Sequence, residues 1–256
     1  MLLRAVYQAP EDRKPAQAPR RGLAGRLALG GLGAALVAVP FTLLAVLVLD
    51  KWEPLARLDA DVANSFHEFV RSHSWMVTTF KVLAIVFDPW VFRIVVVVSA
   101  IWLWRRNAKR LALWAVVTTA IGGLLGVVLK LVVTRTRPSF DDPVARASGY
   151  SFPSGHALNS FLCVAVLILV VLPALTRGGR VLAYTVGAAV VLLTGVDRVA
   201  LGVHYVSDVV AGWIAALACI VGTAGAFEIW RREHGQRPSD PSEGVDPEAA
   251  DEIRDG

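Results

Sequence analysis

Three short polar clusters in this sequence hold the residue types that phosphate-ester chemistry needs. They stand at the ends of long apolar runs, and together they offer three cations, two imidazoles and one carboxylate. Guanidinium and ammonium groups bind phosphate oxygens, while imidazoles transfer protons or act as nucleophiles. The members are Lys130 and Arg137 in the first cluster, Ser154, Gly155 and His156 in the second, and Arg198, His204 and Asp208 in the third. Such a set is suited to holding and cleaving a phosphate ester.

The first cluster is a pair of cations followed by a proline. Lys130 and Arg137 are seven residues apart, about two helical turns, so both would point to one side of a helix that continues to Pro138. Arg137 offers a planar fork of donors that matches phosphate oxygens, and Lys130 adds a flexible point charge. Cations at span ends also extend toward water for purely structural reasons, and for Lys130 alone that interpretation stays open. Arg135 and Arg146 are expected to face water or lipid headgroups.

The second cluster precedes an apolar run, as a helix start does. Ser154 is a natural N-cap, and Gly155 lets the backbone approach a ligand closely. The free N–H groups of a helix start stabilise an anion, so a phosphate could bind there. His156, in the first turn, could protonate a leaving alkoxide oxygen. By itself the tripeptide fits an ordinary helix cap equally well.

The third cluster pairs an imidazole with a carboxylate. His204 and Asp208 are spaced i, i+4, so on a helix the carboxylate can reach the ring. If Asp208 accepts from Nδ1–H, the Nε2 atom is left unprotonated and can act as a nucleophile. Arg198, six residues before His204, could clamp the phosphate oxygens. A satisfied His–Asp pair at a helix start is the structural alternative.

A metal site is a further possibility, because His156, His204 and Asp208 are all plausible ligands. However, Lys130, Arg137 and Arg198 of the first and third clusters would gather around the same point. Positive charges repel a divalent ion and attract a phosphate dianion. We therefore expect an anion site with no metal and no other cofactor.

The composition indicates that membrane-spanning helices position these clusters. The chain has 256 residues, of which 55% are hydrophobic and only 18% charged, which is too apolar for an ordinary soluble domain of this length. The net charge of +5 could suggest nucleic acid, but the cations flank apolar runs, as cytoplasmic flanks of spans do. No nucleic-acid partner is expected. Cys163 and Cys219 fall inside apolar runs and predict no disulfide framework.

We predict an all-α integral membrane bundle of six spans over residues 27–232, with the active site at the outer helix ends. Segment 60–87 is predicted to be helical and interfacial, because its apolar residues recur at helical spacing among charges and residues 75–87 are too few to cross alone. Residues 1–26 and the acidic segment 233–256 are expected to be disordered cytoplasmic tails. The spans expected are 27–49, 90–104, 111–129, 154–172, 181–196 and 209–227.

The basic residues test this count. With six spans, both termini and the four cations within residues 105–110 share one side, as the positive-inside rule requires. All three polar clusters then lie at outer span ends. The prediction is a multi-pass protein of the plasma membrane with cytoplasmic termini and an outward-facing site.

Lys-x6-Arg-Pro, Pro-Ser-Gly-His and Arg-x5-His-x3-Asp, in this order and between hydrophobic spans, resemble the motifs of the type-2 phosphatidic acid phosphatase superfamily. That superfamily shares its site with vanadium-dependent haloperoxidases. The resemblance implies that His204 attacks phosphorus to give a phosphohistidine, that His156 protonates the leaving group and that Asp208 orients His204. It also implies phosphate binding by residues of all three clusters, namely Lys130, Arg137, Ser154, Gly155 and Arg198. At one position the chain departs, because Asp197 stands where the family usually has Ser.

The leading hypothesis is a membrane phosphatase acting on lipid phosphates at the outer leaflet. Its expected partners are membrane lipids and a lipid phosphate substrate, namely a polyprenyl pyrophosphate or monophosphate, phosphatidic acid or phosphatidylglycerol phosphate. The alternatives are a non-catalytic protein that binds or transports lipid phosphates, and a vanadate-dependent haloperoxidase. The oligomeric state is left open.

Overall fold

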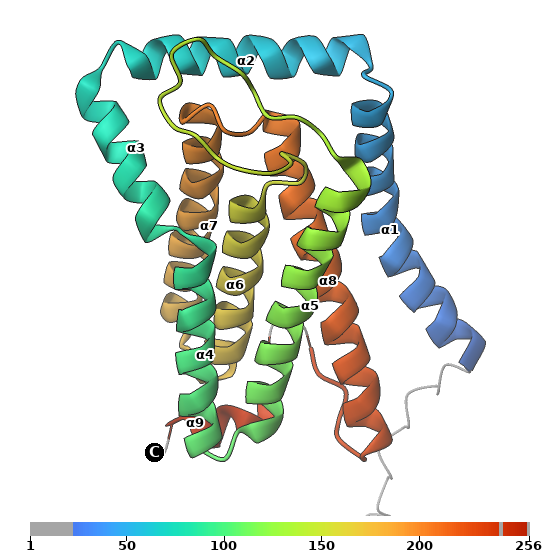
Figure 1. The fold of residues 1–256 in the computed structure, drawn as a ribbon. Helices are drawn as coiled ribbons and strands as arrows, with labels where there is room; N and C mark the ends of the chain where they lie inside the picture. Colours follow the sequence, from blue (N-terminus) through green and yellow to red (C-terminus); the bar gives the residue numbers. More distant parts are fainter. Residues whose placement is uncertain (1–22, 241–242, 255–256) are drawn as a thin grey trace, which may run out of the picture.

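The computed structural model describes residues 23–240 and 243–254, with side chains from residue 36 to residue 253, so most of the predicted tail 1–26 lies outside it. Helices make up most of the described part, and no strand occurs in it, which confirms the all-α prediction. The helices are α1 (Leu23–Leu49), α2 (Glu53–Arg71), α3 (Ser74–Val86), α4 (Pro89–Arg105), α5 (Lys109–Val133), α6 (Gly155–Val171), α7 (Arg177–Ala200), α8 (Val206–Glu233) and α9 (Ala250–Arg254). Most run roughly along one bundle axis, and α2 lies across the upper end (Figure 1).

Within the part of the chain that the structure describes, five helical segments are long and apolar enough to cross a membrane. The predicted span 27–49 lies within α1 (Leu23–Leu49), but the structure describes only part of this helix with side chains, the apolar stretch Leu36–Leu49. The count of six spans is therefore not confirmed. The five segments are Ser74–Arg105, Lys109–Val133, Gly155–Ala174, Arg177–Ala200 and Val206–Glu233.

The first of these segments is a broken helix, which differs from the predicted layout. The sequence predicts an interfacial segment to residue 87 and a span starting at residue 90, whereas α3 descends from α2 toward the bundle middle and α4 continues to the lower end (Figure 1). The 17 residues of α4 rise only about 26 Å, less than the ~30 Å hydrocarbon core, so α3 supplies the missing length. At the break, the Asp88 carboxylate caps α4 by accepting from the Trp90 N–H at 2.8 Å.

Helix α6 is the centre of the bundle and packs against α4, α5, α7 and α8. Its inward side chains, including Leu158, Leu162 and Val166, are fully buried. Helix α8 approaches its start very closely, because a Cβ added to Gly212 would lie 2.8 Å from the Ser154 carbonyl oxygen. Glycine at this position therefore fixes how α8 sits against the beginning of α6.

The C-terminal segment differs from the predicted disordered tail. Residues Pro247–Ala249 form a 3-10 turn that leads into α9 at the lower end of the bundle (Figure 1). The fully buried Arg231 side chain forms ion pairs with Asp246 and Glu248 of this segment. Val245 and Ala249 are buried against the apolar side chains of the bundle. These contacts give the segment a packed structure that its acidic composition does not suggest.

Candidate active site

The three polar clusters meet at the upper end of the bundle, beneath the segment that joins α5 to α6 (Figure 1). The Arg137 guanidinium lies 3.0 Å from His204 Nε2, which joins the first cluster to the third. Lys130 Nζ and Arg137 Nη2 both donate to the Tyr150 carbonyl oxygen, at 2.7 and 3.2 Å. The Lys130 side chain also passes close to Gly155, since its Cε atom would be 3.8 Å from a Cβ built there. Residues far apart in the sequence thus form one cluster.

The helix that carries Lys130 ends earlier than the sequence suggests. Thr134 adopts a left-handed conformation with φ of 49° and terminates α5, so Arg137 lies in the following segment and not on the same helix face. The Arg137 side chain instead turns back over the site. It is held by four backbone carbonyl oxygens, at Ser148 and Gly149 (3.0 Å each), Tyr150 (3.2 Å) and Val203 (2.7 Å).

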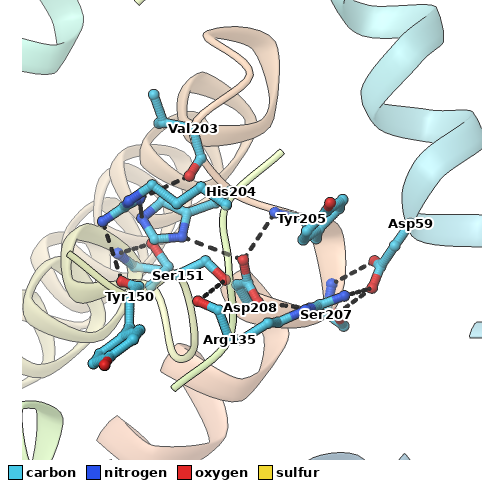
Figure 2. Close-up of polar contacts among 12 residues, drawn as sticks. Asp59, Arg135, Tyr150, Ser151, Val203, His204, Tyr205, Ser207 and Asp208 are labelled. Carbon is cyan, nitrogen blue, oxygen red and sulfur yellow. Dashed lines mark hydrogen bonds and ion pairs between the residues drawn. The ribbon is translucent and has the colours of Figure 1, made fainter. Parts of the chain in front are cut away.

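His204 is buried between a carboxylate and a guanidinium (Figure 2). Its Nδ1 atom lies 3.4 Å from Asp208 Oδ2, and its Nε2 atom lies 3.0 Å from Arg137 Nη1. Because a guanidinium can only donate, Nε2 must be the unprotonated nitrogen and Nδ1 the protonated one. Burial lowers the pKa of His204 to about 4, although the bond to Asp208 raises it. At neutral pH the ring is therefore neutral, with a lone pair on Nε2.

A second guanidinium, that of Arg198, lies near Arg137. Burial lowers the pKa of Arg137, and the nearby charge of Arg198 lowers it further, while Asp208 opposes the change. Two guanidinium groups held close together in a partly buried site repel each other, and a bound anion would relieve that repulsion.

Arg198 itself is 5% exposed and pairs with its neighbour Asp197. Its Nε atom donates to Asp197 Oδ2 at 2.9 Å, and an Nη atom contacts the same oxygen. Asp197 occupies the position where the sequence departs from the family pattern. Its carboxylate offsets part of the Arg198 charge and orients the guanidinium.

The start of α6 contributes the remaining predicted residues. Ser154 is fully buried, and its hydroxyl caps the helix by accepting from the Ala157 N–H at 3.4 Å. The Ser154 N–H donates to the Asp208 carbonyl oxygen at 2.9 Å, which ties the start of α6 to the start of α8. His156 follows in the first turn, with its Nε2 atom 3.8 Å from Asp88 Oδ2.

The contact between Asp88 and His156 is a feature that sequence reasoning missed. One oxygen of the Asp88 carboxylate caps α4, and the other faces the imidazole of His156. The sequence Asp-Pro signalled only a helix break. Asp88 reaches the site only in the folded bundle, where the break between α3 and α4 lies at the level of the first turn of α6.

Residues 111–232 match the sequence profile of the PAP2 superfamily. Over these residues the chain is similar to that superfamily. The match covers all three polar clusters and confirms the resemblance seen in the motifs.

Two named phosphatases are similar to parts of the chain. It is 37% identical over 97 residues to phosphatidylglycerophosphatase B of Bacillus subtilis (strain 168), covering 37% of this chain and 47% of that protein. It is 31% identical over 122 residues to an undecaprenyl-diphosphatase of Sulfolobus acidocaldarius, covering 46% of this chain and 55% of that protein. The chain thus spans about half the length of the curated relatives it matches.

A solved structure has the same fold. The crystal structure of a transmembrane PAP2-type phosphatidylglycerolphosphate phosphatase from Bacillus subtilis aligns with a TM-score of 0.68, covering 78% of this chain and 98% of that one. The sequence identity is 22%, so this likeness concerns the fold. Together with the five apolar helices, it identifies the chain as an integral membrane protein.

The candidate site includes a second layer of residues that the sequence did not reveal. Arg135 was expected to face water or headgroups, but its guanidinium is turned inward (Figure 2). It donates to Asp208 Oδ1 at 2.6 Å, to Ser207 Oγ at 2.7 Å and to Asp59 Oδ2 at 2.8 Å. Burial lowers the pKa of Arg135, but the two carboxylates raise it above its ordinary value. Arg135 therefore links α2 to the carboxylate that contacts His204.

Asp59 is the α2 end of this link. Its side chain is 1% exposed, and it also accepts from the Ser207 N–H at 3.0 Å. The buried residues of α2 are Asp59, Ala63, His67 and Val70, which recur at helical spacing. A carboxylate on the buried face of an amphipathic helix is the sequence signal that could have predicted this contact with Arg135, because a buried charge requires a partner.

Proposed function

We propose that this protein is a membrane phosphatase that removes the terminal phosphate of lipid phosphates through a covalent intermediate on His204. The observation that carries the proposal is the neutral His204 ring, whose unprotonated Nε2 faces the cations of the site. A neutral imidazole beside grouped cations suits nucleophilic attack on a bound phosphate. The names of the two relatives, a phosphatidylglycerophosphatase and an undecaprenyl-diphosphatase, support the same class of reaction.

The first step transfers the phosphoryl group to the protein. Nε2 of His204 forms a bond to phosphorus as the bond from phosphorus to the lipid oxygen breaks. His156 gives its proton to that leaving oxygen, so the lipid departs as a neutral alcohol or, from a diphosphate, as a monophosphate. Asp208 stabilises the positive charge that develops on the ring of His204.

The second step releases inorganic phosphate. His156, now neutral, takes a proton from a water molecule that attacks phosphorus in line with the P–N bond. That bond breaks, and Nε2 of His204 regains its lone pair. Lys130, Arg137, Arg198 and the N–H groups at the start of α6 stabilise the charge on the phosphoryl oxygens in both steps.

The position of the site favours lipids over soluble esters. Its residues lie at the ends of apolar helices, so a headgroup could reach them while the acyl or prenyl chains stay in the bilayer. The basic residues within 105–110 follow α4 at the opposite end of the bundle. By the positive-inside rule, we place that end in the cytoplasm and the site on the outer face of the plasma membrane.

Release of inorganic phosphate from a panel of lipids by the detergent-purified protein tests the proposal. The panel comprises phosphatidylglycerophosphate, a polyprenyl diphosphate and phosphatidic acid. We expect His204→Ala to lower the rate by about 10³-fold or more for every accepted lipid. His234→Ala, which alters an exposed histidine just beyond α8, is the matched control. Turnover by His204→Ala at the parent rate would refute the mechanism.

A further inference from the structure

Arg93 is a cation within a membrane-spanning segment that the proposed chemistry does not use. It lies in α4, inside the apolar segment Ser74–Arg105. Its Nε atom donates to Asn159 Oδ1 at 3.0 Å, and its guanidinium lies 5.2 Å from the centre of the Trp90 ring. Among the described residues, no carboxylate pairs with Arg93 and no acceptor takes a hydrogen bond from its two terminal nitrogens. A charged group in a span, without a counter-ion, points to a ligand.

The Arg93 guanidinium borders a groove that opens sideways between α4 and α5. The groove has a volume of about 420 Å³ and is lined by Trp90, Arg93, Gly123 and several apolar residues. Gly123 leaves room for the cation, because a Cβ added there would lie 3.0 Å from Arg93 Nη2. Leu124 and Val127 on the groove wall are 66% and 54% exposed, so the groove faces the lipid. A lipid could therefore lie in it with its chains in the bilayer.

Three helices give the depth of Arg93 relative to residues at the site, namely His156, Asp88 and Lys130. Asn159, its partner on α6, lies three residues beyond His156, a rise of about 4.5 Å. On α4, Arg93 itself lies five residues beyond Asp88, a rise of about 7.5 Å.

On α5 the corresponding neighbour is Gly123, seven residues before Lys130, and this spacing is about 10.5 Å along the helix. Gly123 and Lys130 share a helix face, being two turns apart. By these spacings the guanidinium of Arg93 lies about one to two helical turns deeper than His156, Asp88 and Lys130.

The depth of Arg93 distinguishes between two kinds of lipid that carry a second phosphate, diphosphates and glycerol-linked bisphosphates. The phosphorus atoms of a diphosphate share a bridging oxygen and lie closer together than one helical turn, ~5.4 Å. In a lipid whose terminal phosphate is joined by glycerol to an internal phosphodiester, the two groups are separated by a distance comparable with a turn. With the terminal phosphate at His204, the phosphodiester of such a lipid would lie deeper, toward its acyl chains.

Resting on the proposed phosphatase function, we infer that Arg93 binds the internal phosphodiester of a glycerol-linked bisphosphate lipid and makes such lipids the preferred substrates. The fork of the guanidinium supplies two donors to the phosphodiester oxygens, while Asn159 and Trp90 hold its orientation. Phosphatidic acid has no second phosphate to place there. A diphosphate has a second phosphate, but this group lies too close to the scissile bond to reach Arg93.

The test compares Arg93→Gln with the parent on phosphatidylglycerophosphate, phosphatidic acid and a polyprenyl diphosphate. The variant keeps a side chain that can bond Asn159 but loses the charge. We expect the ratio of kcat/KM for phosphatidylglycerophosphate to that for phosphatidic acid to fall about 10- to 100-fold. Arg105→Gln, the same change at the other end of α4, should leave this ratio unaltered. Thermal unfolding of both variants verifies that they are folded.

An equal loss on all three lipids would overturn the inference and leave the phosphatase function intact. If instead the parent releases no phosphate from any lipid, the proposed function fails and binding becomes the readout. Phosphatidylglycerol in nanodiscs, which carries only the phosphodiester, should then bind the parent more tightly than Arg93→Gln. Equal binding to both proteins, or displacement of the lipid by inorganic phosphate alone, would refute the subsite.

Discussion

Replacing Arg135 tests whether the second layer of the site positions the nucleophile. Arg135 bonds two carboxylates that are almost wholly buried, Asp208 at 2.6 Å and Asp59 at 2.8 Å. In Arg135→Gln both would lose their cation, and breaking a buried ion pair in this way costs about 3–5 kcal/mol of stability. Without that anchor the Asp208 carboxylate can turn away from His204. A displacement of the order of 1 Å lowers the rate by about 10²-fold.

The assay separates positioning from substrate binding. Arg135 does not touch the phosphate in this account, so kcat should fall about 10²-fold while KM changes little. Arg135→Lys keeps the charge and should recover part of kcat. Arg146→Gln alters an exposed arginine of the same segment and is the matched control.

Asp59→Asn supplies a second check, because Arg135 then keeps one of its two carboxylate partners. We expect a smaller fall in kcat than for Arg135→Gln, and less than additive losses when the two changes are combined. A folded Arg135→Gln protein with parental kcat, or one in which only KM rises, would refute the reasoning.

Three further predictions follow from the described contacts. Folding lowers the pKa of His204 from 6.5 to about 4, so the unfolded chain binds a proton at this residue first as the pH falls. The free energy of unfolding should therefore be highest above pH 6.5 and decrease toward pH 4. Unfolding titrations should show a decrease that is ~3 kcal/mol larger than in His204→Gln. Asp88→Asn removes the carboxylate that faces His156, and steady-state kinetics should show kcat about 10-fold lower with KM nearly unchanged. Gly212→Ala places a Cβ 2.8 Å from a backbone carbonyl of α6 and should cost about 1–3 kcal/mol in thermal unfolding, whereas Gly222→Ala, with no atom within 4 Å, should not destabilise the protein.

The sequence allowed the convergence of the polar clusters to be expected because each one abuts an apolar run. The ends of a span lie at the two membrane faces, and the number of spans decides which face each end reaches. With six spans, Lys130, His156 and His204 are all expected at the same face. The i, i+4 spacing likewise brings Asp208 near His204 whether or not the helix has begun, and α8 in fact begins between them, at Val206.

The parts that could not be expected depend on contacts between distant segments. Arg135 and Arg137 are two residues apart and chemically identical, yet one faces Asp59 on α2 and the other faces His204. No local pattern distinguishes them. The left-handed Thr134, which redirects the chain after α5, and the break at Asp88, which divides a span in two, are local events whose consequences appear only in the packed bundle.

The most direct test of the central claim is to trap the phosphorylated protein. The parent is mixed with a lipid whose terminal phosphate is radiolabelled, quenched within milliseconds in alkali, and digested for mass spectrometry. We predict an acid-labile, alkali-stable phosphate on His204 that is absent from His204→Ala. Label on any other residue, or steady release of phosphate by His204→Ala, would contradict the account.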